Sequence, residues 1–546
     1  MSTAPQDRPQ LSDAQLRTLA YFAIGVASEG SNAGRNVAYQ LSFAGNISGN
    51  VMTPVGNSGF SIGTLQTDLG QHPEVATQLV DAYQRWARQQ QPSLELDARQ
   101  RQQTVSDLQR DGDGIRAQNG RALDGTIRGH LNTFLASSDG VAFVHAHDVS
   151  QVDRLLRHGD GRRDPGGAMQ QLRGTDLYQH ASLDDQAKLA TMLMKLENQA
   201  GLSRYPGVLR SIASGDLASV DDVKTRIDGM LPNRVVRGRE QPDYLESGVE
   251  HALKGTEVFN RLRAAGPGNP MRDVFAGVSA DPLASPVALA ADRAHPEALH
   301  RYEVVKTLFL QNTEAPAYLD ALQHGRSHAW GRPQAAGNSP ATAGLYASGD
   351  DLVIWNRDGR GHAFIDGQWS TVPRAELHRQ QNADGSIDLN RAPRNGMPEQ
   401  LLHVEPAQPE RRRAALSDPL LQQAEEAVRR LQDSQAQPFG ENAQRLAASS
   451  TCLAREAGLT RIDHVVLGAS PSQDGRAETL FVVQGDPSDP AHLRAQMPAA
   501  QAFATPVDTS LAQLQSLNDA HRQTDARSRQ EEQDHQSTLS QQARSV

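Results

Sequence analysis

The segment that ends at Glu29 constrains the fold of this 546-residue chain more than any other feature. Ser12, followed by Gln15 three residues later, has the pattern of a capping box and marks a helix start. The apolar residues that follow recur at helical spacing: Leu16, Leu19, Ala20, Ala23, Ile24 and Ala27. After Glu29, residues 31–63 are punctuated by Asn, Gly and Ser, which favours short hairpins. A buried helix that stops at a carboxyl group and gives way to hairpins predicts an α+β domain.

The pattern changes several times further along the chain. Helical periodicity returns at about residue 75 and continues to about residue 262. Residues 265–340 are rich in Pro, Gly and Ala, with one predicted helix near 297–311. Residues 343–372 alternate as strands do, separated by the turns "NRDGRG" and "DG". A compact α/β pattern then runs from residue 418 to about 514.

These changes predict a multidomain protein. It has an α-rich (α+β) N-terminal domain, a small β-containing middle region and a compact α/β C-terminal domain. The expected parts are a disordered leader at 1–10, the N-terminal domain with a helical extension at 11–260, a middle region with a β module and linker at 261–413, the C-terminal domain at 414–515, and a disordered Gln-rich tail at 516–546.

Charge and cysteine content exclude several classes of protein. The 64 acidic residues outnumber 54 basic ones, for a net charge of −10, so we expect no nucleic-acid partner. The one cysteine, Cys452, lies in an apolar run and is expected to be an inert buried thiol, which excludes a disulfide framework. There is no Walker loop, HExxH or G-x-S-x-G motif, and we expect no cofactor and no metal. The first 30 residues lack the basic start and apolar core of a signal peptide.

Glu29 has the position that a general acid needs. A carboxyl group at a helix C-terminus faces the negative end of the helix dipole, and burial acts in the same direction. Both effects are expected to favour its protonated form. Cleavage of a glycosidic bond needs such an acid at the scissile oxygen, together with a group that stabilises the positively charged sugar ring or delivers water.

The glycine-punctuated segment 57–71, "NSGFSIGTLQTDLGQ", supplies polar groups that suit a substrate site. Its glycines allow close backbone approach. Its candidate substrate-binding residues are Asn57, Ser61, Thr64 and Gln66. Asp68 is the first acidic residue after Glu29 and is therefore the candidate second catalytic carboxylate in this segment. The sequence "TDLG" equally suits a helix cap at Asp68.

A helix that ends in Glu and a following "GFSIG" turn resemble the lysozyme superfamily. Residues 59–63 are similar to the turn of phage-type lysozymes, and "GTLQ" at 63–66 is similar to the "GLMQ" of lytic transglycosylases. The resemblance covers about residues 10–205 and implies a lysozyme-like fold, peptidoglycan as substrate, and Glu29 as the catalytic acid. It also matches Ser61 and Gln66 to residues of the family motifs. Phage lysozymes carry an Asp between the catalytic Glu and the turn, and this chain has none there, which leaves a single-acid, transglycosylase-like reaction open.

The segment 144–156, "VHAHDVSQVDRLL", offers another group of polar residues. On a strand, His145 and His147 would share a face and suit a metal. The following residues instead read as a helix capped by Asp148. A role for His147 or Asp148 along the glycan cleft is a third alternative.

The C-terminal blocks occur in a recognisable order. They are "DPLLQQAEEAVRRL", "GLTRIDHVV" at 458–466, "VVQGDP" at 482–487 and a late "TPV", which predict two helices, two strands and a terminal amphipathic helix. These blocks closely resemble the C-terminal domain of type IV secretion effectors of the Xanthomonadales, called XVIPCD. The resemblance implies that the domain binds the coupling ATPase of the secretion machine and has no catalytic role. Arg461, Asp463 and Asp486 are candidates for secretion recognition or for the turn geometry of the domain itself.

Together the two resemblances imply an antibacterial toxin effector. It would be made in the cytoplasm without a signal peptide, secreted by a type IV system into the periplasm of rival bacteria, and there cleave the glycan backbone of peptidoglycan as a muramidase-type hydrolase. A cognate periplasmic immunity lipoprotein is an expected partner. The alternatives are a lytic transglycosylase that uses the same site and a non-enzymatic effector that binds an envelope component.

Overall fold

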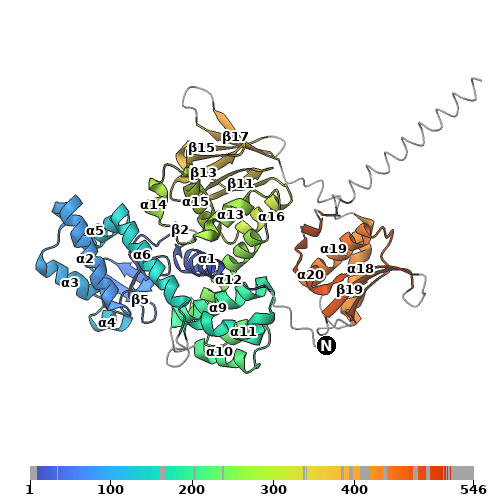
Figure 1. The fold of residues 1–546 in the computed structure, drawn as a ribbon, viewed down its shortest axis with the longest axis horizontal. Helices are drawn as coiled ribbons and strands as arrows, with labels where there is room; N and C mark the ends of the chain where they lie inside the picture. The colour runs from blue at the N-terminus through green and yellow to red at the C-terminus, as the bar shows by residue number, and fades with distance from the viewer. Residues whose placement is uncertain are drawn as a thin grey trace, which may run out of the picture. The chain divides into compact units, whose positions relative to one another are not determined.

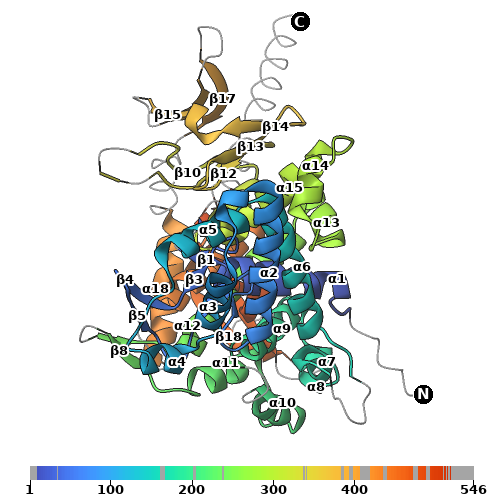
Figure 2. The same cartoon turned by 90° about the vertical axis from the view of Figure 1, so that its left-hand side faces the viewer.

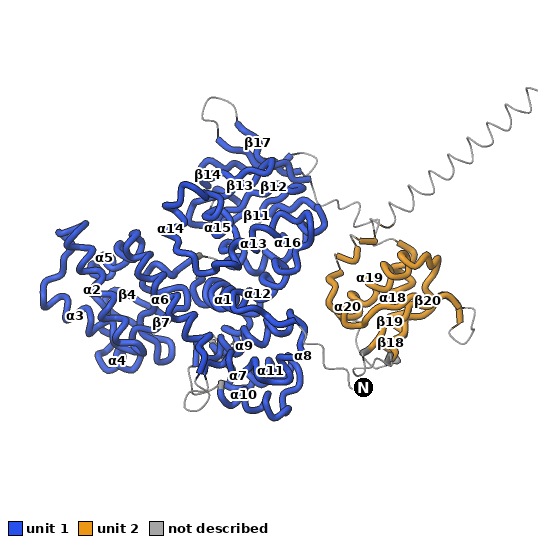
Figure 3. The backbone as a smooth tube through the Cα atoms, in the orientation of Figure 1, with its two compact units in different colours: residues 1–405 blue, residues 406–546 orange. Residues whose placement is uncertain are grey.

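The structure, a computed structural model, describes most of the chain in two compact units. Unit 1 comprises residues 1–405 and unit 2 comprises residues 406–546 (Figure 3). The described residues are 9–507, 509–511, 513–514 and 517, without 33–34, 160–165, 201–204, 237–238, 336–337, 340, 383–385, 393–397, 406–417, 435–439, 471–476 and 487–491. The expected leader and tail therefore lie almost wholly outside the described residues.

Helices dominate unit 1. In the N-terminal half they are α1 (Asp13–Thr18), η1 (Leu19–Glu29), α2 (Pro73–Gln90), η2 (Pro92–Leu94), α3 (Ala98–Leu108), α4 (Gly112–Ala117), α5 (Gly125–Leu135) and α6 (Ser138–Leu155). Then follow α7 (Ala168–Arg173), α8 (Asp176–His180), α9 (Leu183–Ala200), α10 (Tyr205–Ala213), α11 (Val220–Asp228), α12 (Tyr244–Arg263), α13 (Met271–Ala280), α14 (Pro286–Ala291), α15 (Pro296–Leu310) and α16 (Ala315–Gln323). The predicted capping box at Ser12 and Gln15 is confirmed. The predicted helix near 297–311 is confirmed as α15.

Short strands follow the first helix, as the Asn, Gly and Ser pattern predicts. They are β1 (Ser31–Asn32), β2 (Arg35–Asn36), β3 (Ser42–Phe43), β4 (Gly45–Ser48), β5 (Val51–Pro54), β6 (Phe60–Ile62) and β7 (Thr67–Asp68). Strands β3, β6 and β7 form one antiparallel sheet in that order, with Ser61 opposite Asp68. Together with α2–α6 they surround a hydrophobic cluster of their own, and Figure 1 shows α2, α3, α4 and α5 gathered in this lobe.

The helix that ends at Glu29 runs through the largest hydrophobic core of the chain. Leu19, Phe22 and Ile24 of η1 are fully buried, and the same core includes residues of α9, α12 and α15 and of strands in the 343–355 region. Helix α12 approaches η1 closely, because a Cβ at Gly255 would lie 2.8 Å from the Ala23 Cα atom. Residues on both sides of the expected boundary at 260 therefore share one core, and the middle region is part of unit 1.

The middle region carries the predicted β module. Strands β10 (His328–Gly331), β11 (Gly344–Ser348), β12 (Asp351–Trp355), β13 (Arg360–Ile365) and β14 (Gln368–Pro373) form an antiparallel meander. Three more strands form a second sheet: β15 (Leu377–Gln381), β16 (Ile387–Arg391) and β17 (Glu399–Val404). Helix α15 packs on the meander, as Figure 2 shows. Tyr346 and Trp355 are fully buried, so they belong to the core.

Unit 2 is a small α/β domain. Its elements are α18 (Pro419–Ser434), α19 (Glu441–Glu456), β18 (His464–Ser470), β19 (Ala477–Gln484), β20 (Leu493–Pro498) and α20 (Ala499–Ala504). The strands form an antiparallel sheet in sequence order, and β20 is a strand that the sequence pattern did not predict. The prediction for Cys452 is confirmed, since its side chain is buried and burial raises the pKa of its thiol to about 12.

Candidate active site

Glu29 is the last residue of η1, which is wound as a π-helix along its whole length. At its end, the Gly30 N–H donates to the Gly25 carbonyl at 2.6 Å, five residues back. A Cβ at Gly30 would lie 2.7 Å from the Thr64 carbonyl oxygen. Glycine at position 30 therefore lets the 57–71 segment pass directly beside the end of this helix.

A buried lysine holds the carboxyl group of Glu29. The Nζ atom of Lys195 on α9 lies 2.6 Å from Glu29 Oε1 and 2.7 Å from Ser28 Oγ, and the side chain of Lys195 is 1% exposed. Burial lowers the pKa of Lys195, and the Glu29 carboxylate acts against that shift. The sequence predicts surroundings that favour a protonated Glu29, and it did not predict the ammonium group that lies against this carboxyl group.

Asn198, one helical turn after Lys195, joins Glu29 to the glycine-punctuated segment. Its Nδ2 atom donates to Glu29 Oε1 at 3.4 Å and to the Leu65 carbonyl at 3.3 Å. The side chain of Glu29 is 18% exposed, so it is held by partners on one side and open to solvent on the other. Glu29 and the 57–71 segment are therefore neighbours.

The segment next to Glu29 has a strained turn. Gln66 adopts a positive φ of 51°, which few residues other than glycine adopt. Its side chain donates from Nε2 to the Gly63 carbonyl at 2.8 Å, which closes the turn on itself. Asp148 lies beneath this turn and accepts the Thr64 N–H at 2.8 Å through Oδ1. The backbone of the turn is thus fixed by two side-chain contacts.

Asp148 lies inside a helix and not at its start. It lies within α6, which begins at Ser138 with Ser137 as its cap, so the prediction of a helix cap at Asp148 is wrong. The side chain is 1% exposed. Burial raises the pKa of Asp148 to about 7, although the Thr64 and Leu65 N–H groups and the charge of Lys306 act against the rise.

Thr64 and His147 support the turn from behind. Thr64 is 2% exposed, and its methyl group would contact a Cβ at Gly25. His147 Nε2 lies 2.8 Å from Thr67 Oγ1, and burial lowers the pKa of His147 to about 4. His145 and His147 are two residues apart on a helix and so point in different directions, which removes the strand-based metal arrangement. Among the described residues, no group of three or more His, Cys, Asp or Glu residues could hold a metal ion.

The oxygens of Asp68 are occupied by backbone groups. Oδ2 accepts the Gly59 N–H at 2.9 Å, and Oδ1 accepts the N–H groups of Gly70 at 2.8 Å and Gln71 at 3.3 Å. Asp68 therefore joins the residue before β6 to the residues that follow β7. Asn57 at the start of the segment similarly donates to Asp111 at 3.0 Å and accepts the Asp113 N–H at 2.7 Å.

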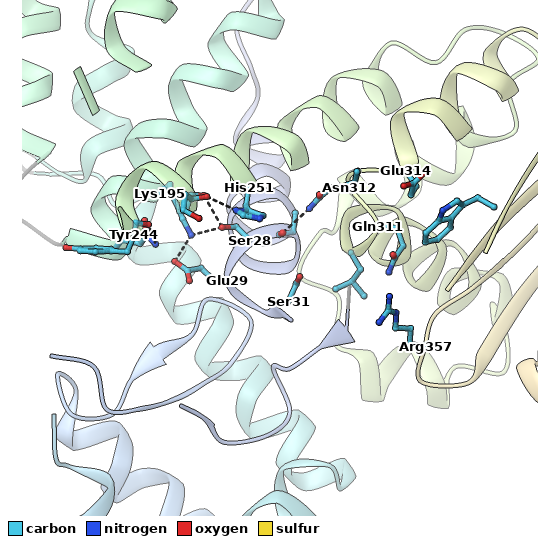
Figure 4. Close-up of a pocket in the computed structure, with 17 residues that line it drawn as sticks. Ser28, Glu29, Ser31, Lys195, Tyr244, His251, Gln311, Asn312, Glu314 and Arg357 are labelled. Atoms are coloured by element: carbon cyan, nitrogen blue, oxygen red, sulfur yellow. Dashed lines mark hydrogen bonds and ion pairs between the residues drawn. The ribbon is translucent and has the colours of Figure 1, made fainter. Parts of the chain in front are cut away.

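Two cavities meet at Glu29. The larger, which we call the loop cavity, has a volume of about 1300 Å³. It is lined by Glu29 together with the predicted residues Asn57, Ser61, Gln66 and Asp68. The smaller, which we call the rear cavity, has a volume of about 600 Å³ and is lined at one end by Ser28, Glu29 and Lys195 (Figure 4). Thr64, His147 and Asp148 line neither cavity, so they position the turn without facing this space.

Helix α9 supplies the site residues that the sequence analysis missed. Lys195, Asn198 and Gln199 come from this helix, as does Glu197, which lines the loop cavity and accepts the Ala168 N–H at 2.8 Å. Burial raises the pKa of Glu197. The sequence carried one signal for this helix, the single lysine in the mostly apolar run 189–196, because a buried ammonium group needs a counter-charge.

In unit 2 the three candidate recognition residues fall into two groups: Arg461 and Asp463 contact each other, and Asp486 is exposed. Asp463 Oδ2 accepts the Gly485 N–H at 2.6 Å and the Arg461 Nε–H at 2.7 Å, so these residues join the turns before β18 and after β19. Burial raises the pKa of Asp463, but these two donors outweigh it and hold that pKa below its usual value. Asp486 is exposed at the end of the second turn.

The comparison with known families bears on this C-terminal part. Residues 412–516 match the family model described as X-Tfes, XVIPCD. The match confirms the resemblance of the C-terminal motifs and supports this domain as the secretion-signal domain of a type IV secretion effector of the Xanthomonadales. No curated protein matches the chain. Within the described residues, no helix has the length and apolar character needed to span a membrane.

Proposed function

We propose that this type IV secretion effector cleaves the glycan backbone of peptidoglycan, with Glu29 as the residue that protonates the scissile oxygen. One observation carries the proposal. Glu29 lies where two cavities meet, beside the turn of the lysozyme-like motif, and Asn198 touches both Glu29 and that turn. A glycan laid along the loop cavity would bring a glycosidic oxygen to this carboxyl group.

In the proposed reaction, Lys195 is the source of the proton that Glu29 donates. Because burial lowers the pKa of Lys195, its ammonium group is a better proton donor than an exposed lysine. In the proposed reaction Lys195 passes a proton to Glu29 across 2.6 Å, and Glu29 passes it to the glycosidic oxygen. The C1–O bond breaks as its electron pair moves to that oxygen. The Glu29 carboxylate that results then stabilises the positively charged sugar ring.

The second half of the reaction needs a nucleophile but no second carboxylate. If water attacks the ring, its proton returns through Glu29 to Lys195, and the product is a hydrolysed reducing end. If the C6 hydroxyl of the same sugar attacks, the proton takes the same path and the product is a 1,6-anhydro end. The use of both Asp68 oxygens by backbone N–H groups favours a reaction with one catalytic carboxyl group, which both routes share.

The secretion-signal domain provides the route to this substrate. In the proposal the coupling ATPase of the type IV machine binds the domain at 412–516, and the toxin reaches the periplasm of a rival cell. Peptidoglycan lies there and not in the cytoplasm where the protein is made. A periplasmic immunity lipoprotein would protect the producing lineage from toxin that neighbouring sister cells deliver.

The decisive experiment compares Glu29→Gln with the double variant Glu29→Gln/Lys195→Met in full-length protein. The single variant leaves a buried ammonium group beside an amide, so we expect a lower melting temperature, whereas the double variant removes that charge and should regain stability. Neither should clear purified cell walls, with a loss of at least ~100-fold relative to the wild-type protein.

Two readouts separate the alternatives. Clearing by the folded double variant at the wild-type rate would remove Glu29 from the chemistry. Mass spectrometry of the fragments released by the wild-type protein assigns the nucleophile, because reducing ends mark a hydrolase and 1,6-anhydro ends mark a transglycosylase. A wild-type protein that binds walls but releases no fragment would be the non-enzymatic envelope-binding effector.

A further inference from the structure

The rear cavity joins Glu29 to a part of the chain that the proposed reaction does not use. Its walls come from η1, α9 and α12, from residues 310–314 at and after the end of α15, and from Trp330 and Arg357 of the β module. Glu29, Ser31, Gln199 and Tyr244 line both this cavity and the loop cavity. The two spaces therefore adjoin at Glu29, and a substrate that branches near its scissile bond can occupy both.

Two residues of the rear cavity, Gln199 and Arg357, have a side-chain polar atom that is shielded from solvent without a hydrogen-bond partner, and the cationic one is Arg357. It lies in the turn between β12 and β13, and its Nε atom is shielded from solvent with no hydrogen-bond partner. No ion pair of Arg357 occurs within the described part of the chain. A buried donor without an acceptor costs about 1–3 kcal/mol, which a bound acceptor would recover. A carboxylate fits the planar guanidinium group best, because it accepts two parallel hydrogen bonds.

The other charged residues of the rear cavity further restrict the chemical class of ligand that it can bind. Glu314 lies beyond Gln311 from Arg357 in Figure 4, and the Glu29–Lys195 pair lies at the opposite end. A polyanion would be repelled by Glu314, whereas a ligand with both a carboxylate and an ammonium group would meet both charges favourably. Trp330 adds a half-buried aromatic surface. Asn312 is buried and donates to the Ala27 carbonyl at 2.9 Å, so this wall is fixed to the helix that carries Glu29.

We propose that the rear cavity binds the peptide stem of peptidoglycan, with a stem carboxylate on Arg357. This inference rests on the proposed function in its choice of polymer. The stem is attached to a sugar next to the scissile linkage, and it carries carboxylates and the amine of its diamino acid. The middle region of the chain thereby acquires a role: it makes cleavage selective for glycan that carries stems.

The first test measures binding without cleavage. The probe is the soluble stem tripeptide L-alanyl-γ-D-glutamyl-diaminopimelate, titrated into full-length protein by calorimetry. Arg357→Gln should weaken binding roughly 10-fold or more, since a charged hydrogen bond is lost. Arg272→Gln is the matched control, because Arg272 is exposed on α13 and lines neither cavity. A wild-type protein that does not bind the tripeptide, or a variant that binds equally well, overturns the inference.

The second test uses two polymers, intact sacculi and glycan strands from which an amidase has removed the stems. Arg357→Gln should slow cleavage of sacculi roughly 10-fold and leave cleavage of bare strands unchanged. Equal loss on both polymers would show that Arg357 holds glycan or only the fold, which overturns the inference. A wild-type protein that binds the tripeptide but cuts neither polymer would instead remove the proposed reaction and leave the stem site in place.

Discussion

The 57–71 segment of unit 1 and the paired turns of unit 2, residues 460–463 and 483–486, are both short polar motifs built around carboxyl groups. In and around the first, three carboxyl groups have different surroundings. Glu29 and Asp68 line cavities, with a buried ammonium group beside Glu29 and backbone N–H groups on Asp68, whereas Asp148 lines neither cavity and is buried beneath the turn. In the second, Asp463 holds two turns together through its contacts with Gly485 and Arg461. A motif thus indicates chemistry only when its polar atoms are left facing space that a ligand can enter.

The largest effect that we predict concerns Asp148, the most buried of these three carboxyl groups. Because burial raises its pKa from 3.8 to about 7, the folded state retains a proton that the unfolded state has lost between about pH 4 and pH 7. The unfolding free energy should therefore fall as the pH rises through this window, by up to about 4 kcal/mol. Asp148→Asn should abolish this fall, since the amide mimics the protonated acid.

The measurement is urea unfolding followed by tryptophan fluorescence at a series of pH values. All four tryptophans, Trp86, Trp330, Trp355 and Trp369, lie in unit 1, so the signal reports that unit alone. Asp139→Asn is the control on the same helix, because Asp139 is exposed. If Asp148→Asn keeps the wild-type slope between pH 4 and pH 7, Asp148 is ionised in the folded state and the contrast with Asp463 disappears.

Much of the fold could be predicted from local pattern. The helices near 75–90 and 185–200 and the turns of the β module follow from periodicity and from glycine. Asp148 was mistaken for a cap because "HDVSQ" has the composition of a helix start, whereas tertiary packing extends α6 back to Ser138. Strand β20 was missed because "LRAQMP" is short and ends in proline.

The site could be predicted only in part, for a geometric reason. Glu29 and the 57–71 segment are close in sequence, and a helix end followed by a glycine-rich loop brings them together. Lys195 and Asn198 reach Glu29 from more than 160 residues away, and nothing local encodes that contact. Lys195 in an apolar helix indicates that a counter-charge must lie nearby, but the sequence does not indicate which carboxylate supplies it.

The next effect tests the role that we propose for the pairing of Glu29 with Lys195. Lys195→Met removes the ammonium group beside Glu29, and we expect wall cleavage at neutral pH to fall about 10-fold to 100-fold. The deficit should shrink in acid, where a carboxyl group takes its proton directly from solvent. Rates of fragment release from pH 4.5 to pH 8 measure this profile.

Lys188→Met is the matched control for that variant. Lys188 lies on the same helix and pairs with Asp185 at 3.1 Å, and its side chain is 45% exposed, against 1% for Lys195. Its replacement should leave both rate and pH profile unchanged. If the rate of fragment release by the Lys195→Met variant falls by the same factor at every pH, Lys195 is a packing residue and not a source of protons.

A smaller effect tests whether Asp68 takes part in the reaction, as we propose for Glu29, or only holds the backbone, as Asp463 does. As a group that accepts three N–H donors, Asp68 should act on stability, and Asp68→Asn should cost about 1–3 kcal/mol of unfolding free energy. Cleavage by the folded fraction should fall less than about 10-fold, as for a residue that positions a loop. The exposed Asp113→Asn serves as control. A loss of more than about 100-fold with an unchanged melting temperature would instead make Asp68 a second catalytic carboxylate.

The smallest effect concerns Asp463, and Cys452 makes it measurable. Cys452 is the one thiol of the chain and is buried in unit 2, so the rate of its modification reports opening of that unit. Asp463→Asn weakens the contacts with Gly485 and Arg461, and we expect a stability loss of ~1 kcal/mol and modification about 5-fold faster at pH 7. The pH dependence gives a second check.

Because the folded-state pKa of Asp463 lies below its ordinary value of 3.8, its stabilising effect is present above about pH 4 and is lost in stronger acid. The rates of Cys452 modification in the wild-type protein and in Asp463→Asn should therefore converge as the pH falls. A pyridyl disulfide, which reacts in acid, is the reagent for this measurement. Wall cleavage should not change. If Asp463→Asn leaves the thiol rate unaltered yet abolishes secretion, the carboxylate faces the secretion machine, and the two motif regions resemble each other after all.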